Sequence, residues 1–181
     1  MVEKKKKHWL REWIESIAIA LVVALFIRTF IVEAFKIPSG SMKPTLEIKD
    51  RIFVNKMTYK FDDIKAGDIV VFRYPKEPKR YFVKRLVACG NDRVQIKDGN
   101  IIINGEILRE PDIFKNNYYY NAEEYGPQGR AITVPENQYY VLGDNSAFSK
   151  DSRYWGFVPR KNIVGKVFLR FWPLWRVGLV R

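Results

Sequence analysis

The chain has 181 residues, 47% of them hydrophobic and 29% charged, which is typical of a folded protein rather than a disordered one. The formal net charge of +12 indicates an anionic neighbour, either a membrane surface or a nucleic acid, although surplus Lys and Arg also serve solubility alone. The single cysteine, Cys89, excludes an intramolecular disulfide and every multi-cysteine metal site.

The only histidine narrows the chemistry further. His8 follows four lysines, Lys4–Lys7, ahead of an apolar segment, a position typical of a solvated flank. A Ser-His-Asp triad and a Cys-His pair therefore lack an imidazole, and a zinc hydrolase lacks its usual ligands. If the protein is a hydrolase, its general base is another residue. We expect neither a metal nor a cofactor.

The first predicted element is an apolar helix over residues 13–35. At about 1.5 Å per residue this segment is long enough to cross the roughly 30 Å hydrocarbon layer of a membrane. Arg28 and Glu33 lie near its outer end, where charged side chains can reach the interface. The lysine run predicts that residues 1–12 are a basic cytoplasmic N-terminus, so that residues 36–181 form an extracytoplasmic domain.

A removable signal peptide is the alternative to this anchor, because Val32-Glu33-Ala34 looks like a small-residue cleavage site. However, Arg28, Phe30 and Ile31 precede that site, whereas the run up to a cleavage point is typically polar. The sequence therefore favours a single spanning helix that is retained.

Beyond Pro44 the sequence predicts a mainly β fold. Runs rich in Val, Ile and aromatic residues and bounded by turn residues predict these strands: Arg51–Lys56, Asp68–Tyr74, Tyr81–Ala88 and Gly165–Phe171. Asp98-Gly99 and Asn104-Gly105 predict two tight hairpin turns. No stretch after residue 44 keeps a helical period over more than two turns. Residues 112–130 are polar and rich in tyrosine, which predicts a small cap-like insertion at about 91–138.

The segment Pro38-Ser39-Gly40-Ser41-Met42-Lys43-Pro44 directly follows the apolar helix. If it is extended, Ser39 and Ser41 point to the same side, and Gly40 between them lets another chain's backbone approach closely. One hydroxyl could then attack a carbonyl while its neighbour and a backbone N–H stabilise the oxyanion. Taken alone, the segment also has the composition of an ordinary Pro/Ser/Gly loop.

A lysine on an apolar strand changes this interpretation. On a strand, Lys84 shares its face with Phe82 and Leu86, while Arg85 faces the other way. Loss of hydration disfavours the ammonium form, so burial can lower a lysine pKa far enough to make the amine a base at neutral pH. The alternative is a lysine whose stem packs on the sheet while its amine reaches water.

A third cluster of polar residues comes later in the chain. Gly143-Asp144-Asn145 is followed by Ser149-Lys150-Asp151-Ser152-Arg153-Tyr154-Trp155-Gly156. Mixed Ser, Asp and Arg in a turn-rich stretch could hold a buried amine through hydrogen bonds and an internal ion pair. Asp and Asn could equally be making turns.

Together, these three segments resemble the conserved boxes of bacterial type I signal peptidases, in the family's order, and the resemblance runs from the apolar helix nearly to the C-terminus. It implies a Ser–Lys dyad in which Ser41 is the nucleophile and Lys84 the general base. Ser39 would donate to the oxyanion, and Ser149 would orient the Lys84 amine. The residues that would support the site are Arg85, Asp151 and Arg153. Those that would line pockets for small substrate side chains are Ile37, Leu46, Phe82 and Val83. Ser146-Ala147-Phe148 differ from the residues that the family usually has at that place.

The resemblance further implies a β fold shared with self-cleaving repressors, behind one transmembrane helix. The activity would be that of a membrane-bound serine endopeptidase, which removes signal peptides from exported preproteins by acyl transfer without a cofactor. Its partners would be preproteins and membrane lipid, and not nucleic acid. The location would be the bacterial inner (cell) membrane, with the catalytic domain on the outer face. We expect the aromatic C-terminus, including Trp172 and Trp175, either to extend an apolar rim around the site or to be buried as a final strand.

Two functions from other classes remain open at the level of sequence. A self-cleaving transcriptional repressor also uses a Ser–Lys dyad, but it needs a DNA-reading helix pair where residues 1–35 offer one apolar helix. A membrane-tethered β module without catalysis would carry the same serines and Lys84 as ordinary surface groups.

Overall fold

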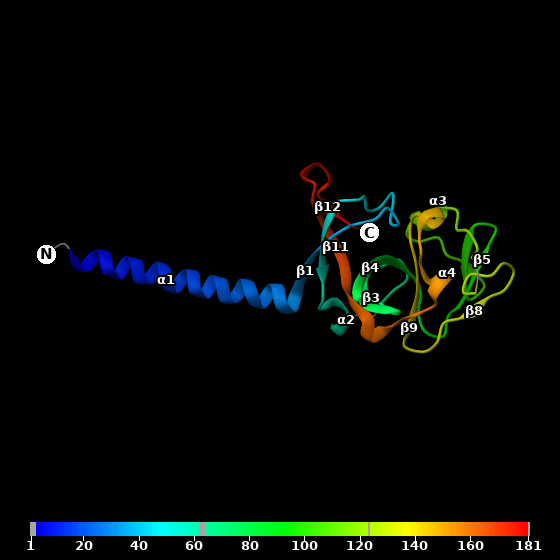
Figure 1. Cartoon of the computed structure of the whole chain (residues 1–181), viewed down its shortest axis with the longest axis horizontal. Coiled ribbons are helices and arrows are strands. Elements are labelled where there is room, and N and C mark those ends of the chain that lie inside the picture. The colour runs from blue at the N-terminus through cyan, green and yellow to red at the C-terminus, as the bar shows by residue number, and fades with distance from the viewer. Residues whose placement is uncertain (1–2, 62–63, 123, 181) are drawn as a thin grey trace.

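Figure 1 shows a long N-terminal helix, α1, that projects away from a body built of β-strands. The computed structural model describes residues 3–61, 64–122 and 124–180, without the side chains of residues 3–8, 60 and 61. The expectations for the side chains of Lys4–Lys7 and His8 therefore lie outside the described residues.

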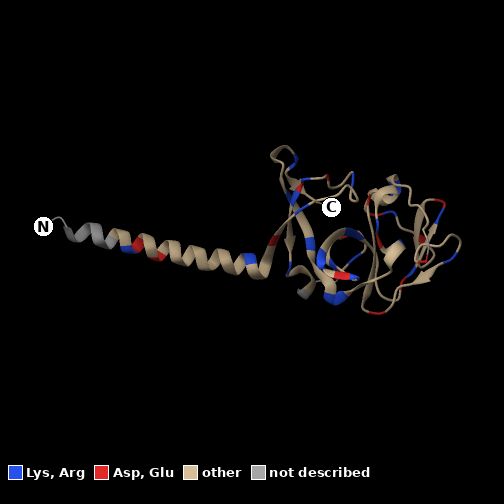
Figure 2. Ribbon diagram, in the orientation of Figure 1, with Lys and Arg blue, Asp and Glu red and all other residues tan. Residues whose placement is uncertain are grey.

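Helix α1 (Glu3–Phe26) continues into a π-helical turn, η1 (Ile27–Ile31). Its large apolar side chains are exposed from Trp9 to Phe30. The 23 residues of Trp9–Ile31 are long and apolar enough to cross a membrane. Figure 2 shows the charged residues of this stretch gathered near its start, followed by a long uncharged run that ends at a single cation. The described N-terminal segment is one helical run and holds no pair of helices of the DNA-reading kind.

The predicted end of the apolar helix at residue 35 is wrong. Val32–Lys36 form strand β1, which runs antiparallel to β2 (Arg51–Asn55) with Ala34 opposite Phe53. Pairing with β2 supplies the backbone hydrogen bonds that a longer helix would have made internally. Glu33 consequently lies on a strand, where its carboxylate is 3.5 Å from the Lys56 amine rather than at the end of a spanning helix.

The larger sheet is antiparallel, with the strand order β1-β2-β11-β3-β4-β9-β10 and β12 paired to β11. Its remaining strands are β3 (Ile69–Tyr74), β4 (Glu77–Ala88), β9 (Gln138–Leu142), β10 (Val158–Pro159), β11 (Ile163–Trp172) and β12 (Gly178–Leu179). The four strands predicted from sequence are confirmed, and β4 begins four residues earlier than expected, at Glu77. Strand β4 lies between β3 and β9, which buries its C-terminal half.

The smaller sheet has the order β7-β6-β5-β8, and its strands are β5 (Arg93–Lys97), β6 (Asn100–Ile103), β7 (Glu106–Ile107) and β8 (Ile132–Thr133). The two predicted hairpin turns are confirmed: Asp98-Gly99 joins β5 to β6, and Asn104-Gly105 joins β6 to β7, with positive φ at all four residues. All four strands fall within residues 91–138; their assignment as a cap stays a prediction.

The helices after residue 44 are short, as the sequence predicted. They are α2 (Thr58–Phe61), α3 (Ile113–Asn116), α4 (Ser152–Trp155) and the 3₁₀ turns η2 (Ser146–Phe148), η3 (Arg160–Asn162) and η4 (Leu174–Arg176). Both η2 and α4 belong to the segment that follows β9. That segment carries the third polar cluster of the sequence.

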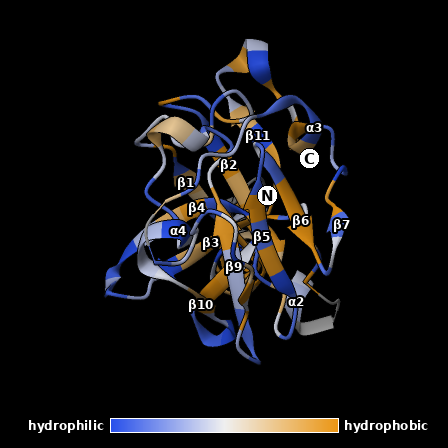
Figure 3. Ribbon diagram, turned by 90° about the vertical axis from the view of Figure 1, so that its right-hand side faces the viewer, coloured by the Kyte–Doolittle hydropathy of each residue, from blue (hydrophilic) through white to orange (hydrophobic). Residues whose placement is uncertain are grey.

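Buried side chains form three hydrophobic clusters, and Figure 3 shows hydrophobic stretches along β5, β6 and β11 within the body. One cluster joins the two sheets through residues such as Ile96 of β5 and Leu142 of β9. A second lies beneath the Pro38–Pro44 segment and includes Ile37, Met42 and Leu46. This second cluster holds the two serines of that segment at the surface of a rigid core.

Of the two alternatives considered for the C-terminal residues, burial is found for part of the hairpin of β11, η4 and β12, and an apolar rim around the site stays a prediction. Phe171 stacks on Phe53 of β2 with ring centroids 4.1 Å apart, so part of the hairpin packs on the sheet. Trp172, Leu174 and Trp175 are exposed, Trp175 by 82%. The tip of the hairpin therefore presents apolar surface to its surroundings.

Candidate active site

The two residues at the centre of the site come from segments 43 positions apart. Lys84 lies in the middle of β4, and Ser41 lies in a turn that follows β1. The Lys84 amine donates a hydrogen bond of 2.6 Å to Ser41 Oγ and a second one of 3.1 Å to the Val83 carbonyl. Both residues are buried, with only 4% of Lys84 exposed. The structure thus joins the lysine and the hydroxyl directly.

Burial of Lys84 alters its protonation. Desolvation lowers the pKa of its amine to about 8, and the nearby Arg153 cation acts in the same direction. Asp151 and Asp144 oppose the shift, because their negative charges favour the ammonium form. The Phe82 ring centroid lies 5.7 Å from the amine and contributes to its apolar surroundings. At neutral pH most of this lysine is still protonated, but the uncharged fraction that can accept a proton is far larger than for an exposed lysine.

The Pro38–Pro44 segment is a turn rather than the extended strand that the sequence argument assumed. The Lys43 N–H donates to the Gly40 carbonyl at 3.2 Å, which closes the turn. The two hydroxyls still lie on one side, since Ser39 Oγ is 3.5 Å from Ser41 Oγ. The expected proximity of the two serines is found, although a turn produces it.

Within the chain a close approach of backbones occurs at Gly143, and the approach of another chain's backbone at Gly40 stays a prediction. A Cβ on Gly143 would overlap both the Ser41 carbonyl oxygen and Ser149 Oγ, whereas at Gly40 it would meet only the flexible Lys43 side chain. Asn145 then ties the two segments together, because its N–H donates to the Ser41 carbonyl at 3.0 Å and its amide to the Gly40 carbonyl at 3.1 Å. The absence of a side chain at Gly143 is what lets the segment after β9 lie against Ser41.

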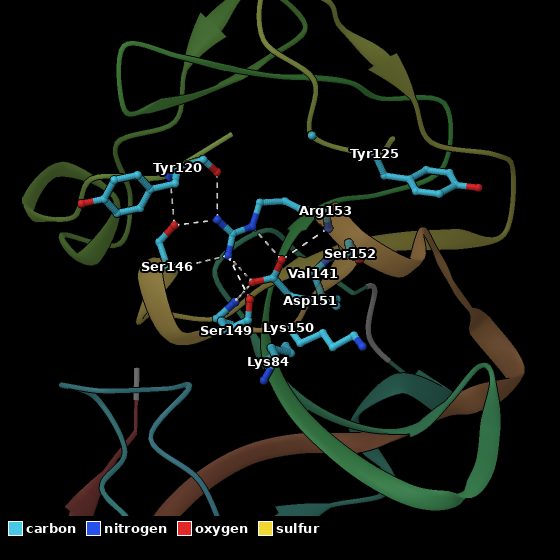
Figure 4. Close-up of polar contacts among 12 residues, drawn as sticks. Lys84, Tyr120, Tyr125, Val141, Ser146, Ser149, Lys150, Asp151, Ser152 and Arg153 are labelled. Carbon is cyan, nitrogen blue, oxygen red and sulfur yellow. Dashed lines mark hydrogen bonds and ion pairs between the residues drawn. The ribbon is translucent and has the colours of Figure 1, made fainter. Parts of the chain in front are cut away.

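Arg153 and Asp151 form the polar centre of that segment. Arg153 Nε donates to Asp151 Oδ1 at 2.8 Å, and both side chains are buried. Asp151 also accepts the Gly143 N–H at 3.0 Å, while the other end of Arg153 donates to the carbonyls of Ser146 at 2.7 Å and Ser149 at 3.2 Å. Figure 4 shows these bonds fanning out from Arg153, above Lys84. One ion pair therefore fixes the backbone on both sides of Ser149.

Arg85 and Asp144 form a second buried ion pair, on the opposite face of β4 from Lys84. The guanidinium donates two hydrogen bonds of 2.8 Å to the Asp144 carboxylate and a third of 2.8 Å to the Gly67 carbonyl. Thr45 donates to the same carboxylate at 2.5 Å. The pair connects β4, the turn after Ser41 and the start of the segment after β9.

Ser149 is buried in this cluster, and no hydrogen bond joins it to Lys84 in the part of the chain that the structure describes. Its Oγ has no hydrogen-bond partner among the residues that the structure describes. It faces Gly143 on the same side as the Ser41 carbonyl. An orienting hydrogen bond from Ser149 to the Lys84 amine stays a prediction.

A cleft of about 260 Å³ opens beside Ser41 and Lys84. Three of the four residues expected to bind substrate line it: Ile37, Phe82 and Val83. Leu46 does not line it, because its side chain is fully buried in the hydrophobic cluster beneath the turn.

Sequence reasoning missed other residues that line the cleft, namely Pro38, Met42, Tyr81, Phe148 and Lys150. Tyr81 and Met42 adjoin residues that had been singled out, so adjacency on the strand and on the turn was a usable signal. Phe148 and Lys150 carried no such signal. Among the described residues there is no group of three or more His, Cys, Asp or Glu side chains placed to bind a metal ion.

Comparison with known proteins gives a consistent result. The profile of the family described as "Signal peptidase, peptidase S26" matches residues 10–172. A probable signal peptidase I-2 from Synechocystis is 42% identical over 98% of this chain and 82% of its own length. Signal peptidase I P of Bacillus subtilis subsp. natto is 38% identical over 97% of this chain and 96% of its own length. The crystal structure of a signal peptidase I from Enterococcus faecalis superposes on 58% of this chain and 97% of its own, with 31% identity and a TM-score of 0.48.

The family profile covers most of the chain, and these relatives align with nearly all of it. The chain therefore belongs to the peptidase S26 family and is a signal peptidase I, a serine peptidase that removes signal peptides.

Proposed function

We propose that Ser41 and Lys84 form the catalytic dyad with which this signal peptidase cleaves preproteins. The observation that carries the proposal is the 2.6 Å hydrogen bond between the buried Lys84 amine and Ser41 Oγ. The direction of the Lys84 pKa supports it, because an amine must be uncharged to accept the serine proton. No histidine among the residues around this pair could take over the role.

The reaction proceeds by acyl transfer. Ser41 Oγ attacks the scissile carbonyl while the Lys84 amine takes the hydroxyl proton, so that the carbon–oxygen bond forms without a free alkoxide. As the carbon–nitrogen bond breaks, the Lys84 ammonium returns this proton to the departing amine. Water, deprotonated by the same lysine, then attacks the acyl-enzyme and releases Ser41. No metal and no cofactor takes part in these steps.

Ser39 and the Ser41 backbone N–H stabilise the negatively charged oxygen of the tetrahedral intermediate. The 3.5 Å between the two serine oxygens leaves the Ser39 hydroxyl only weakly engaged before the reaction and able to turn toward an oxyanion. This arrangement favours the transition state over the bound substrate.

Arg153, Asp151, Arg85 and Ser149 support the site without reacting. The Asp151–Arg153 pair holds the backbone around Ser149 and Gly143, and the Arg85–Asp144 pair holds β4 next to the Ser41 turn. Ser149 brings an unpaired hydroxyl close to Ser41. A modest side-chain rotation that directed this hydroxyl at the Lys84 amine would orient the base.

The cleft accepts the end of the signal peptide. Ile37, Phe82 and Val83 give it apolar walls, and a volume of about 260 Å³ suits small side chains ahead of the scissile bond. The substrates are exported preproteins whose signal peptide is held in the membrane.

The protein spans the bacterial inner membrane once, with Trp9–Ile31 in the bilayer. The lysine-rich start of the chain faces the cytoplasm, and the β body, which includes residues 36–181, faces the outside as the catalytic domain. Trp172, Leu174 and Trp175 at the tip of the C-terminal hairpin contact the outer leaflet, since they are exposed and accompanied by Arg176. Lipid, rather than nucleic acid, is thus the anionic partner of this cationic chain.

The dyad is tested by replacing each member. We expect Ser41→Ala and Lys84→Ala each to lower preprotein cleavage by on the order of 10⁴-fold or more, because neither group acts without the other. Lys79→Ala is the matched control: it removes an exposed lysine of the same strand and should cleave normally. Cleavage is followed in detergent, and circular dichroism checks the fold. Normal turnover by either dyad variant would rule the mechanism out.

The oxyanion role of Ser39 gives a different kinetic pattern. Ser39→Ala should slow kcat by roughly 10²–10³ with little change in KM, since the lost hydrogen bond forms only in the transition state. Steady-state kinetics on one preprotein measures both constants. A rise in KM at constant kcat would instead mean that Ser39 binds substrate.

The lowered pKa of Lys84 sets the expected pH dependence. Protonation as the pH falls below about 8 removes the base, so kcat/KM should fall by about tenfold per pH unit on the acidic side. The profile is measured with a substrate that does not titrate in this range. An acidic limb centred near the ordinary lysine pKa would show that Lys84 is not kept dry, and a flat profile would exclude it as the base.

Membrane topology is tested with an epitope tag at Met1. A retained anchor keeps the tag on the mature protein, and a cytoplasmic N-terminus protects it from protease added to spheroplasts while the β body is digested. Loss of the tag from the mature protein would show that the apolar segment is a removed signal peptide. Digestion of the tag in intact spheroplasts would show that the N-terminus lies outside, the opposite of the proposed orientation.

A further inference from the structure

Phe148 and Lys150 line the same cleft as Ser41 and Lys84, and the dyad mechanism uses neither of them. Both side chains are exposed, Phe148 by 82%, while Ser149 between them is buried. This alternation places an aromatic ring and a cation side by side at the mouth of the cleft.

The backbone beneath the two side chains is held firmly. The Phe148 N–H donates to the Asn145 carbonyl at 3.0 Å, and Arg153 donates to the Ser149 carbonyl at 3.2 Å. The indole of Trp155 donates to the Lys150 carbonyl at 3.3 Å. The ring and the amine therefore project from a fixed edge rather than from a loose loop.

Lys150 brings a charge that nothing in the cleft balances. None of the residues lining the cleft is acidic, and the Lys150 amine forms no ion pair with any residue that the structure describes. Asp151, its neighbour in sequence, is fully engaged by Arg153 and by the Gly143 N–H. Figure 4 shows the Lys150 side chain passing Lys84 with its amine pointing in a different direction. Because Lys84 is buried and Lys150 is exposed, Lys150 is the accessible cation that a bound peptide meets.

We propose that Phe148 and Lys150 form a subsite for an acidic residue of the preprotein close to the scissile bond. The substrate carboxylate pairs with the Lys150 ammonium, and the neighbouring part of the peptide packs on the Phe148 ring. The proposal rests on the function proposed above for this cleft. It adds a preference for a negatively charged substrate residue to a cleft whose other walls select for small substrate side chains.

A substrate residue fits this position better than a lipid headgroup does. The two side chains belong to the lining of the cleft that holds Ser41, whereas the exposed apolar group of Trp172, Leu174 and Trp175 is on the β11–β12 hairpin. Figures 1 and 3 both show that hairpin well away from α4, which directly follows Lys150. Contact of Lys150 with the membrane is therefore an alternative outcome of the experiment.

The test uses peptide substrates that differ at one position only, carrying Glu, Gln or Lys in turn from the third residue before the scissile bond to the third after it. Cleavage is measured in neutral detergent. At one position the wild-type protein should prefer Glu over Gln by about two- to fivefold in kcat/KM, the range of a partly exposed ion pair. Added salt should shrink this preference. Lys150→Glu should reverse it in favour of the Lys substrate.

Lys97→Glu is the matched control, because it makes the same change in net charge at an exposed residue of β5 outside the cleft. It should leave the preference for Glu unchanged. A wild-type protein without any such preference, or a Lys150→Glu variant that keeps it, would overturn the subsite. The subsite is also overturned if Lys150→Glu lowers cleavage of all substrates equally and only on anionic vesicles, since Lys150 then contacts lipid.

The Gln substrate separates this proposal from the one on which it rests. If cleavage of the Gln substrate depends on Ser41 and Lys84, but the charge of the varied substrate residue has no effect, only the subsite is ruled out. Failure of the wild-type protein to cleave any of the peptides in a dyad-dependent manner removes the proposed mechanism and the subsite with it.

Discussion

The proposed reaction depends on keeping the Lys84 amine out of water beside the Ser41 hydroxyl. In the proposed mechanism Lys84 acts on Ser41 only while its amine is uncharged, and water around the amine would restore the charge. Strand β4 lies inside the larger sheet, between β3 and β9, and its C-terminal half, which includes Lys84, is buried. The turn that carries Ser41 sits on the cluster of Ile37, Met42 and Leu46, which closes the site from below. The packing of the core thus holds the turn that carries the proposed nucleophile.

Other charged side chains are buried near that amine, and their pairing limits the free-energy cost of burying them. Asp144 and Asp151 would each favour the ammonium form of Lys84, but each is paired with an arginine that offsets its field. Charges buried in this way are tolerated because every one of them is paired and hydrogen-bonded. The pairs also reach backbone carbonyls at Gly67, Ser146 and Ser149, so they fix loops that have no regular secondary structure of their own. The pKa of Lys84 can therefore be lowered although Asp144 and Asp151 lie near it.

Much of this arrangement could be predicted from the sequence, and the failures have physical causes. Turn chemistry and alternating apolar residues determine hairpins and strands locally, which is why the turn at Asp98-Gly99 and the strand of Lys84 were found. The end of the apolar helix was missed because β1 exists only through pairing with β2, some twenty residues away. Leu46 was misplaced for a related reason: the turn from Gly40 to Leu46 directs its side chain inward. Phe148 and Lys150 reach the cleft through bonds made by Arg153 and Trp155, which no local pattern reveals.

The connection between the apolar helix and Ser41, the proposed nucleophile, suits the substrate proposed above, which is held in the membrane. Ser41 follows Ile31, the last residue of the helical run, by ten positions, a length of chain that reaches at most about 33 Å when fully extended. Half of that connection is strand β1, whose ladder with β2 fixes its direction relative to the body. Rotation of the catalytic body about a loose linker is thereby restricted, and Ser41 stays within a short reach of the end of the helix. If the helix spans the membrane as proposed, a cleavage site just outside the bilayer lies within that reach, and the helix then positions Ser41 as well as anchoring the chain.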